Sequence, residues 1–466
     1  MTTSQERLDR LRGAYGEREA RGMGDSEKRL ARLRGACAAG GMDAFYVRDT
    51  SNIRWLTGFD GVFDEERAHA LLVTQDAVAL HTDSRYAEAA LAAAGGTGVE
   101  VDVARMTHAA FAAERMRRAA ERSDARTGGV PKRATLGIED AITLAEYRQL
   151  QRAFGEKAAG TADAGAPDAA GAMDVGVPDA AGVPGAPHAI ASGGTVGPGG
   201  VPDALGAAGA ASVEDAGAAS ACPGSRLRET SDVVVGLRAV KDAGEIARMR
   251  AAQAVTDAAF AHIVSFMRPG MTERAVQVEL EGFMRRHGAD DLAFPSIVAA
   301  GANGASPHAV PGDTVLEAGQ CVVLDFGAKA RGYCSDMTRT VFLGEPDARL
   351  RSAYETLRRA NEQVERALRP GVTGKEMHEL AERVLDEGGF GGLMGHGLGH
   401  GVGLDIHELP NLSPRNEAPL MAGNVVTVEP GIYVPGEFGM RLEDFGVVTE
   451  EGFQVFTQST HDMVII

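Results

Sequence analysis

The glycine-rich stretch at residues 394–408 constrains this chain more than any other feature. It places His396, His400 and His407 among five glycines. Because glycine has no side chain, the backbone can bend tightly here and other groups can approach it closely. Neutral imidazole is a common metal ligand and a usual acid/base group near neutral pH. The stretch therefore favours either a metal site with a proton shuttle or a turn whose histidines hydrogen-bond to nearby carbonyls.

Four carboxylates in apolar segments help to decide between these interpretations. Residues 321–327 read as a buried strand that carries Asp325. Asp336 lies in a second strand-like segment, Glu429 ends a β-branched run, and Glu443 follows a short apolar segment. Burying several carboxylates is costly unless cations neutralise them. Oxygen-rich ligation with a single nitrogen suits two divalent ions, with manganese favoured and cobalt, iron or zinc as substitutes.

The order and local sequence of these motifs resemble the pita-bread metallopeptidases. That family includes aminopeptidase P, prolidase, methionine aminopeptidase and the metal-free creatinase. Residues 396–408 match the form typical of prolidase-like members, with Gly397 where that form often has serine. The resemblance implies that two metal ions are held by five ligands: Asp325, Asp336, His400, Glu429 and Glu443.

The resemblance also implies roles for three histidines that do not bind metal. His308 matches a histidine on the loop facing the substrate, and His407 matches one that binds substrate and assists proton transfer. His396 matches a histidine that lines the pocket, and a structural hydrogen bond to a neighbouring carbonyl is the alternative role.

Four further residues have expected roles. Arg441 lies two residues before Glu443 and so on the same face of a strand, where it could bind substrate or hold a ligand carboxylate. We expect Arg339 and His287 to be ordinary surface or helix residues. Trp55 lies in a segment, residues 52–59, that resembles the amino-terminal domain shared by creatinase, prolidase and aminopeptidase P. It is expected either to pack in the core or to line the rim of a partner subunit's active site.

Composition divides the 466 residues into four parts. Residues 158–224 contain no lysine, arginine or aromatic residue, and a segment so poor in large apolar side chains is expected to be a flexible insertion. The expected parts are an extension at 1–25, a creatinase-like α/β domain at 26–157, the insertion at 158–224, and a pita-bread catalytic domain at 225–466.

The predicted fold class is α/β (α+β), with the smaller domain first. In the second domain, the sequence Pro-Gly-x-Thr at 269–272 recurs at 370–373, each time between two predicted helices. Such a repeat indicates an internal duplication, as the pseudo-symmetric halves of the pita-bread fold would require.

Charge and cysteine usage exclude several other classes. A net charge of −18 argues against binding nucleic acid or an anionic membrane as the main activity. The four cysteines show no CxxC spacing, so neither a zinc finger nor a disulfide framework is indicated. The chain has no apolar run of about 18 residues, which a membrane span needs. A cytoplasmic location is expected, and the resemblance implies a homodimer.

The expected activity is metal-assisted hydrolysis of a peptide with proline in second position, cut before that proline. Glu429 would accept the proton of the attacking water, while His407 and His308 would stabilise the oxyanion or pass a proton to the leaving nitrogen. The substrate could be a longer peptide, as for aminopeptidase P, or a dipeptide, as for prolidase. The alternative is a non-catalytic pita-bread module that binds a protein partner, although such modules usually lose metal ligands.

Overall fold

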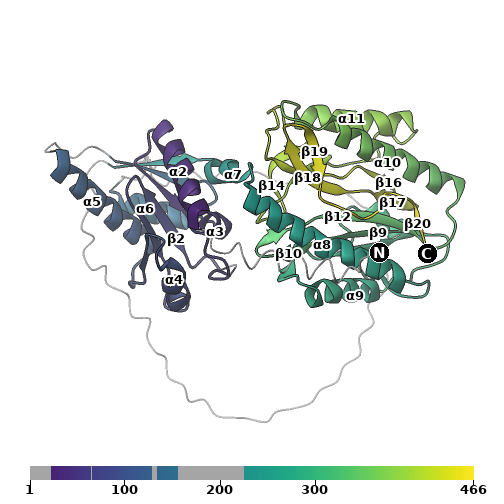
Figure 1. Cartoon of the computed structure of the whole chain (residues 1–466), viewed down its shortest axis with the longest axis horizontal. Coiled ribbons are helices and arrows are strands. Elements are labelled where there is room, and N and C mark those ends of the chain that lie inside the picture. Colours follow the sequence, from purple (N-terminus) through teal and green to yellow (C-terminus); the bar gives the residue numbers. More distant parts are fainter. Residues whose placement is uncertain (1–22, 65, 128–133, 156–224) are drawn as a thin grey trace, which may run out of the picture.

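The computed structural model describes residues 23–64, 66–127, 134–155 and 225–466, which form two domains (Figure 1). The insertion predicted at 158–224 and the first 22 residues of the predicted extension lie outside these ranges. The extension was expected to end at residue 25, but the first described helix already begins at Met23.

The first domain is built on a mixed six-stranded sheet. Its central strand pairs antiparallel with one neighbour and parallel with the other. In the spatial order β4-β3-β2-β1-β5-β6, the strands are β1 (Ala44–Val47), β2 (Ala70–Thr74), β3 (Val78–His81), β4 (Val99–Asp102), β5 (Thr135–Glu139) and β6 (Arg226–Thr230).

Helices cover both faces of this sheet because alternate residues of each strand point to opposite sides. Phe45 packs with the helices of one face, while its neighbour Tyr46 packs with those of the other. The first face is covered by α2 (Met23–Ala39), α3 (Thr50–Thr57) and α4 (Ala87–Ala94), and the second by α5 (His108–Thr127) and α6 (Leu144–Ala153).

Strand β6 corrects the domain boundary expected at residue 225. It pairs in parallel with β5 and so completes the first sheet. No apolar pattern indicates this edge strand, because Arg226–Thr230 consists of charged and polar residues around one leucine and is largely exposed. The second domain begins only after it, through the short helix α7 (Val233–Arg238).

One half of the second domain is a four-stranded sheet covered by two helices. Asp325 lies opposite Thr338 in the antiparallel pair formed by its two central strands. The sheet has the order β20-β12-β9-β8, with β8 (Ile297–Ala300), β9 (Cys321–Phe326), β12 (Met337–Phe342) and β20 (Val464–Ile465). The covering helices are α8 (Ala243–Phe266) and α9 (Glu273–Arg286). A small sheet beside it contains β7 (Asp291–Leu292), β10 (Ala328–Ala330) and β11 (Tyr333–Cys334), and the 3-10 helix η2 (Gly301–Ala305) follows β8.

The other half repeats this plan with a five-stranded sheet. Its order is β14-β13-β15-β18-β19, with β13 (Gly399–Gly401), β14 (Glu408–Leu412), β15 (Val425–Val428), β18 (Asp444–Thr449) and β19 (Gly452–Val455). It is covered by α10 (Ala348–Ala367) and α11 (Gly374–Glu387), and a hairpin of β16 (Gly431–Val434) and β17 (Phe438–Arg441) lies beside it.

The two helix pairs confirm the repeat predicted from the sequence. Thr272 and Thr373, the threonines of the two Pro-Gly-x-Thr segments, each accept a backbone N–H as N-cap of the second helix in their pair. Figure 1 shows the pairs on opposite sides of the second domain, with the strands between them. The duplicated sequence therefore produces two similar halves around a shared interior.

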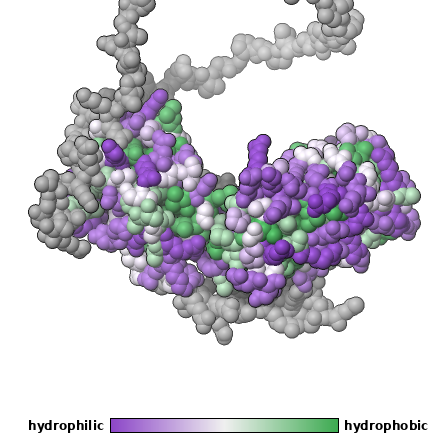
Figure 2. All heavy atoms as spheres, turned by 90° about the horizontal axis from the view of Figure 1, so that it is seen from above, coloured by the Kyte–Doolittle hydropathy of each residue, from purple (hydrophilic) through white to green (hydrophobic). Residues whose placement is uncertain are grey.

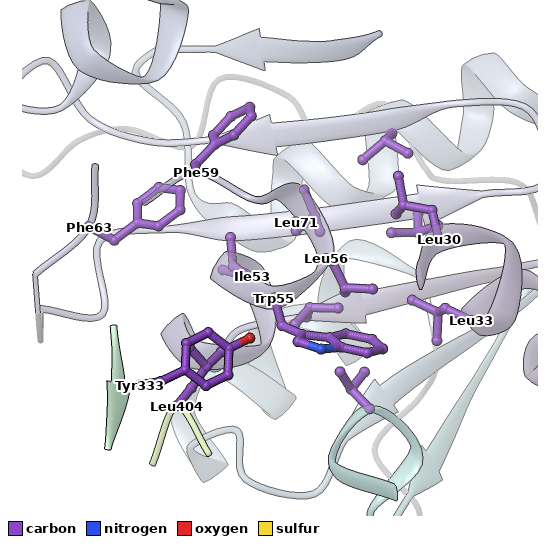
Figure 3. Close-up of a cluster of buried hydrophobic side chains, with 14 of the residues drawn as sticks. Leu30, Leu33, Ile53, Trp55, Leu56, Phe59, Phe63, Leu71, Tyr333 and Leu404 are labelled. Carbon is purple, nitrogen blue, oxygen red and sulfur yellow. The ribbon is translucent and has the colours of Figure 1, made fainter. Parts of the chain in front are cut away.

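Trp55 packs where the two domains meet (Figure 3). Its ring is 1% exposed, and its Nε1 donates a hydrogen bond of 2.8 Å to Glu245 Oε1. Tyr333 of the second domain donates to the same oxygen, also at 2.8 Å. Trp55 therefore takes the core-packing role, because a ring buried within its own chain cannot line a partner's site.

The outer surface of the described residues carries mostly polar groups on the face shown in Figure 2, with hydrophobic side chains in smaller patches between them. None of the described helices combines the length and the apolar character that crossing a membrane requires.

Candidate active site

The five residues predicted as metal ligands meet in one cavity of about 490 Å³ in the second domain. Asp325 lies in β9, and Asp336 directly precedes β12. From the other half, His400 lies in β13, Glu429 directly follows β15, and Glu443 directly precedes β18. The fold thus collects from both halves the residues that the sequence spreads over more than a hundred positions.

His400 faces the carboxylates with one ring nitrogen. Its Nε2 lies 3.6 Å from Asp336 Oδ2 and 3.4 Å from Glu429 Oε1. Its Nδ1 lies 3.0 Å from the carbonyl oxygen of Gly401, to which it donates, so the lone pair of the neutral ring stays on Nε2. One ligand atom from each of Asp336, His400 and Glu443 lies within 4.8 Å of the others. This arrangement presents converging lone pairs to a cation.

The electrostatics of the five residues favour a cation between them. Burial, together with the charges of neighbouring carboxylates, raises the pKa of Asp336 and of Glu443 well above the usual range. Burial also raises the pKa of Glu429. Within the described part of the chain, the buried Oδ1 atom of Asp325 has no hydrogen-bond partner. Because buried polar atoms are nearly always satisfied, this orphaned oxygen and the oxygen-rich donor set fit divalent metal ions.

Arg441 forms an ion pair with one of these carboxylates, that of Asp325. Its buried guanidinium donates to Asp325 Oδ2, to Thr338 Oγ1 at 3.0 Å and to the Tyr433 hydroxyl at 2.7 Å. Thr338 in turn donates to Glu443 Oε2 at 2.6 Å. Of the two roles expected for Arg441, the structure shows the contact with a ligand carboxylate. Since Arg441 also lines the cavity, its contact with substrate stays a prediction.

His396 combines both of the roles weighed for it. Its Nδ1 donates to the carbonyl oxygen of Gly397 at 2.7 Å, and its Nε2 accepts from the Tyr433 hydroxyl at 3.0 Å. It also lines the cavity. The structural hydrogen bond therefore fixes the ring in a place where substrate could reach it.

The outer part of the cavity carries the other two predicted histidines. His308 and His407 are both exposed and line the same cavity as the carboxylates. The His407 ring lies edge-on to His400, with 4.3 Å between ring centroids. Apolar side chains form much of the remaining wall: Phe294, Pro295, Ile297, Pro307, Val310, Pro311 and Ile406.

The glycines of residues 394–408 are needed for close packing around His400. A Cβ atom at Gly399 would lie 2.2 Å from the carbonyl oxygen of Thr427, and one at Gly403 would lie 2.5 Å from the Glu408 carboxylate. Any larger residue would therefore push the loop out of place. This agrees with the close approach that the sequence predicts for this stretch.

Arg339 was expected to be an ordinary surface or helix residue, and this expectation is wrong. The side chain is 1% exposed in β12 and donates to Asp444 Oδ1 at 2.7 Å and to the Glu443 carbonyl oxygen at 2.6 Å. An arginine inside a β-branched run, together with an aspartate beside a predicted ligand, was the available signal. His287 does follow a helix, as expected, and donates to the Phe283 carbonyl oxygen.

The fold and this donor set together define the class: a two-domain protein of the pita-bread type with a candidate metal centre between the halves of its second domain. Residues 247–450 match the model of metallopeptidase family M24, and residues 29–166 match that of the creatinase/prolidase N-terminal domain. An uncharacterized peptidase, YqhT from Bacillus subtilis, is 43% identical over 242 residues, which are 52% of this chain and 69% of the relative. The chain therefore belongs to metallopeptidase family M24. Matches to staphylococcal relatives cover 63% of their length.

Solved structures extend the similarity over both domains. An Xaa-Pro dipeptidase from Bacillus anthracis is 30% identical with a TM-score of 0.71, covering 95% of this chain and 100% of the other. An X-Pro aminopeptidase from Thermotoga maritima is 28% identical with a TM-score of 0.66, covering 91% and 98%. These matches confirm the predicted fold class, in which a smaller α/β domain precedes a pita-bread catalytic domain.

Proposed function

We propose that this protein is a divalent-metal-dependent exopeptidase that hydrolyses the bond before a proline in second position of a peptide. The observation that carries the proposal is the convergence of four carboxylates, three of them buried, and His400 Nε2 at one end of a cavity whose wall is largely apolar. The names of the similar structures, an Xaa-Pro dipeptidase and an X-Pro aminopeptidase, support the same substrate class.

Asp325, Asp336, His400, Glu429 and Glu443 are the residues that would hold the metal. When bound, two divalent ions, with manganese favoured, supply a water whose pKa is lowered toward neutrality. Glu429, whose carboxylate lies 3.4 Å from His400 Nε2, would accept the proton of that water. Arg441 keeps the Asp325 carboxylate in place through its own three-way contact.

The two exposed histidines act at the other side of the scissile bond. His407 and His308, which line the cavity, would donate to the oxyanion or to the leaving nitrogen. The nitrogen of proline, like that of any leaving amine, needs a proton to leave, and because the Xaa-Pro bond is a tertiary amide it offers no N–H for the enzyme to bind. The apolar wall would hold the proline ring.

The alternative, a non-catalytic module that binds a protein partner, explains less of the site. A role in binding a partner does not explain four carboxylates gathered in one cavity, three of them buried, because their charges destabilise the fold without a cation. The choice between dipeptides and longer peptides depends on loops at the cavity mouth. We also propose that the protein forms a homodimer.

The test is hydrolysis by purified protein after metal removal and reloading with manganese. Ala-Pro and Ala-Pro-Ala are assayed side by side, with Ala-Ala and Ala-Ala-Ala as matched controls. Release of alanine from the proline peptides, lost with a chelator and restored by manganese, is expected. Equal cleavage of the proline-free controls, or full activity with no metal by elemental analysis, would overturn the proposal.

A further inference from the structure

A buried network of charges holds the segment that carries His407. Glu408, the next residue, is 6% exposed, and its carboxylate receives hydrogen bonds from Arg238 and, at 3.1 Å, from Lys241. The backbone N–H of Asp405 donates to Glu408 Oε1 at 3.0 Å. Because the carboxylate also lies directly over Gly403, it fixes both ends of the turn at 403–408.

The cations of this network come from the connection between the domains, and the network reaches into the first domain. Arg238 is the last residue of α7, and it also donates to Asp405 Oδ2 and to Asn52 Oδ1, both at 2.7 Å. Ser51 of the first domain donates to the other oxygen of Asp405. Both domains therefore contact the turn, because Ser51 and Arg238 donate to the two carboxylate oxygens of Asp405 and Arg238 also donates to Asn52.

Glu408 and Arg238 both stay ionised over the whole working pH range. Burial alone would raise the pKa of Glu408, but Lys241 and Arg238 outweigh it and lower this pKa to about 2. The carboxylates around Arg238 raise its pKa as well. Removing one member of a buried ion pair is strongly unfavourable because its partner is left uncompensated. Because these ion pairs are buried, they should hold the 403–408 turn more strongly than an exposed salt bridge would. We call this network the tether.

The ring of His407 itself lies edge-on to that of His400. It is exposed, whereas Glu408 beside it is buried. An acid/base group must be placed accurately to act, since small displacements of a reacting group are costly in rate. We propose that Arg238 and Glu408 are positioning residues, which hold the 403–408 turn so that His407 faces the cavity. The linker and first domain thereby act on the active site of the same chain. This inference rests on the acid/base role proposed above for His407.

Hydrogen exchange of the manganese-loaded full chain tests the tether without relying on activity. Arg238→Met should raise the exchange rate of residues 401–410 by about tenfold or more, because the turn opens locally once its anchor is lost. Arg248→Met is the matched control, since Arg248 forms a half-exposed pair with Asp60 between the domains and is absent from the network. Its exchange at 401–410 should match wild type. Unchanged exchange in Arg238→Met would overturn the tether.

A double-mutant cycle tests whether the tether acts through His407. Arg238→Met should lower kcat about 10- to 100-fold with metal content kept, as is typical of residues that orient a functional group. In a His407→Ala background, it should lower kcat little further. An equal loss in both backgrounds would show a purely structural role and overturn the proposal. Arg238→Lys, which keeps the charge, should recover part of kcat, and it replaces Arg238→Met if that variant does not fold.

Failure of the proposed function gives a different result from failure of the tether. If wild type with manganese cleaves none of the proline peptides while Arg238→Met still loosens 401–410, the tether exists and the assigned reaction is wrong. If the peptides are cleaved and Arg238→Met affects neither exchange nor kcat, the positioning role is wrong and the assigned reaction stands.

Discussion

The two ends of the cavity are built in opposite ways. At the inner end, three of the carboxylates (Asp325, Asp336 and Glu443) are buried, and each sits on or directly beside a strand. At the outer end, His308 and His407 are exposed on connecting segments. The inner end resists movement but is electrostatically strained without metal. The outer end is unstrained but depends on other parts of the chain to hold it. Metal binding and proton transfer should therefore respond differently to mutation.

The largest expected effect is at the inner end. Asp336→Asn removes one ligand charge while keeping the side chain's shape, so metal affinity and activity should both collapse. The loss should exceed the roughly 10- to 100-fold typical of residues that only support a ligand. Steady-state hydrolysis of Ala-Pro at saturating manganese measures it. Near-wild-type turnover in this variant would mean that Asp336 is no ligand.

A smaller loss is expected at the outer end. His407→Ala should lower kcat about 10²- to 10⁴-fold, the usual contribution of general acid/base catalysis. His262→Ala, which alters a partly buried histidine on α8 that pairs with Glu279, serves as the histidine control and should keep its activity. If both variants lose turnover equally, the effect of His407→Ala does not come from proton transfer.

Arg441→Met should give a smaller loss than either of these variants, because Arg441 supports a ligand without being one. Arg441→Met removes the donor to Asp325 and should cost about 10- to 100-fold in metal affinity or activity. Measuring activity over a range of manganese concentrations separates an effect on metal affinity from one on turnover. If Arg441 supports a ligand, the variant should need more manganese for half-maximal activity. A change in KM for peptide alone would instead assign Arg441 to substrate binding.

Removing the charge of Glu443 at the inner end and of Glu408 beside His407 should change the melting temperature in opposite directions. The pKa of Glu443 is raised by burial and neighbouring carboxylates, so in metal-free protein its ionised form destabilises the fold once the pH rises past the unfolded value of about 4.3. Glu443→Gln should therefore raise the melting temperature of metal-free protein at pH 7.5.

Glu408 has the opposite shift, with a pKa lowered to about 2. Its contribution is present above the unfolded value of about 4.3 and is lost as pH falls toward 2. Glu408→Gln should lower the melting temperature at pH 7.5, and its difference from wild type should shrink as the buffer is acidified from about pH 5. Calorimetry of Glu443→Gln and Glu408→Gln measures both melting temperatures. Shifts of the same sign at pH 7.5 would contradict this difference between the two carboxylates.

The metal ligands at the inner end could be predicted from the sequence because their carboxylates lie in or beside apolar segments. An aspartate such as Asp325 inside an apolar run needs a compensating charge wherever it is buried, so the pattern itself points to a cation. The repeated Pro-Gly-x-Thr segment gave the two halves for a similar reason, since it fixes a helix start in each.

The side-chain contacts that hold the site could not be predicted from the sequence. Both Arg339 and Arg238 are buried in the fold. Their partners lie more than a hundred residues away, Asp444 for one and Glu408 for the other, so no local spacing reveals the pairs. Strand β6 was missed because its pairing partner, β5, gives it structure that its own exposed side chains do not indicate.

Metal content per chain in two histidine variants tests the central claim most directly. His400 Nε2 faces the carboxylates, whereas His407 is exposed beside the same ring. After equal reloading with manganese, elemental analysis at matched purity should find about two ions per chain in wild type and in His407→Ala, and fewer in His400→Ala. Two ions retained by His400→Ala, with metal lost from His407→Ala, would contradict this account of the site.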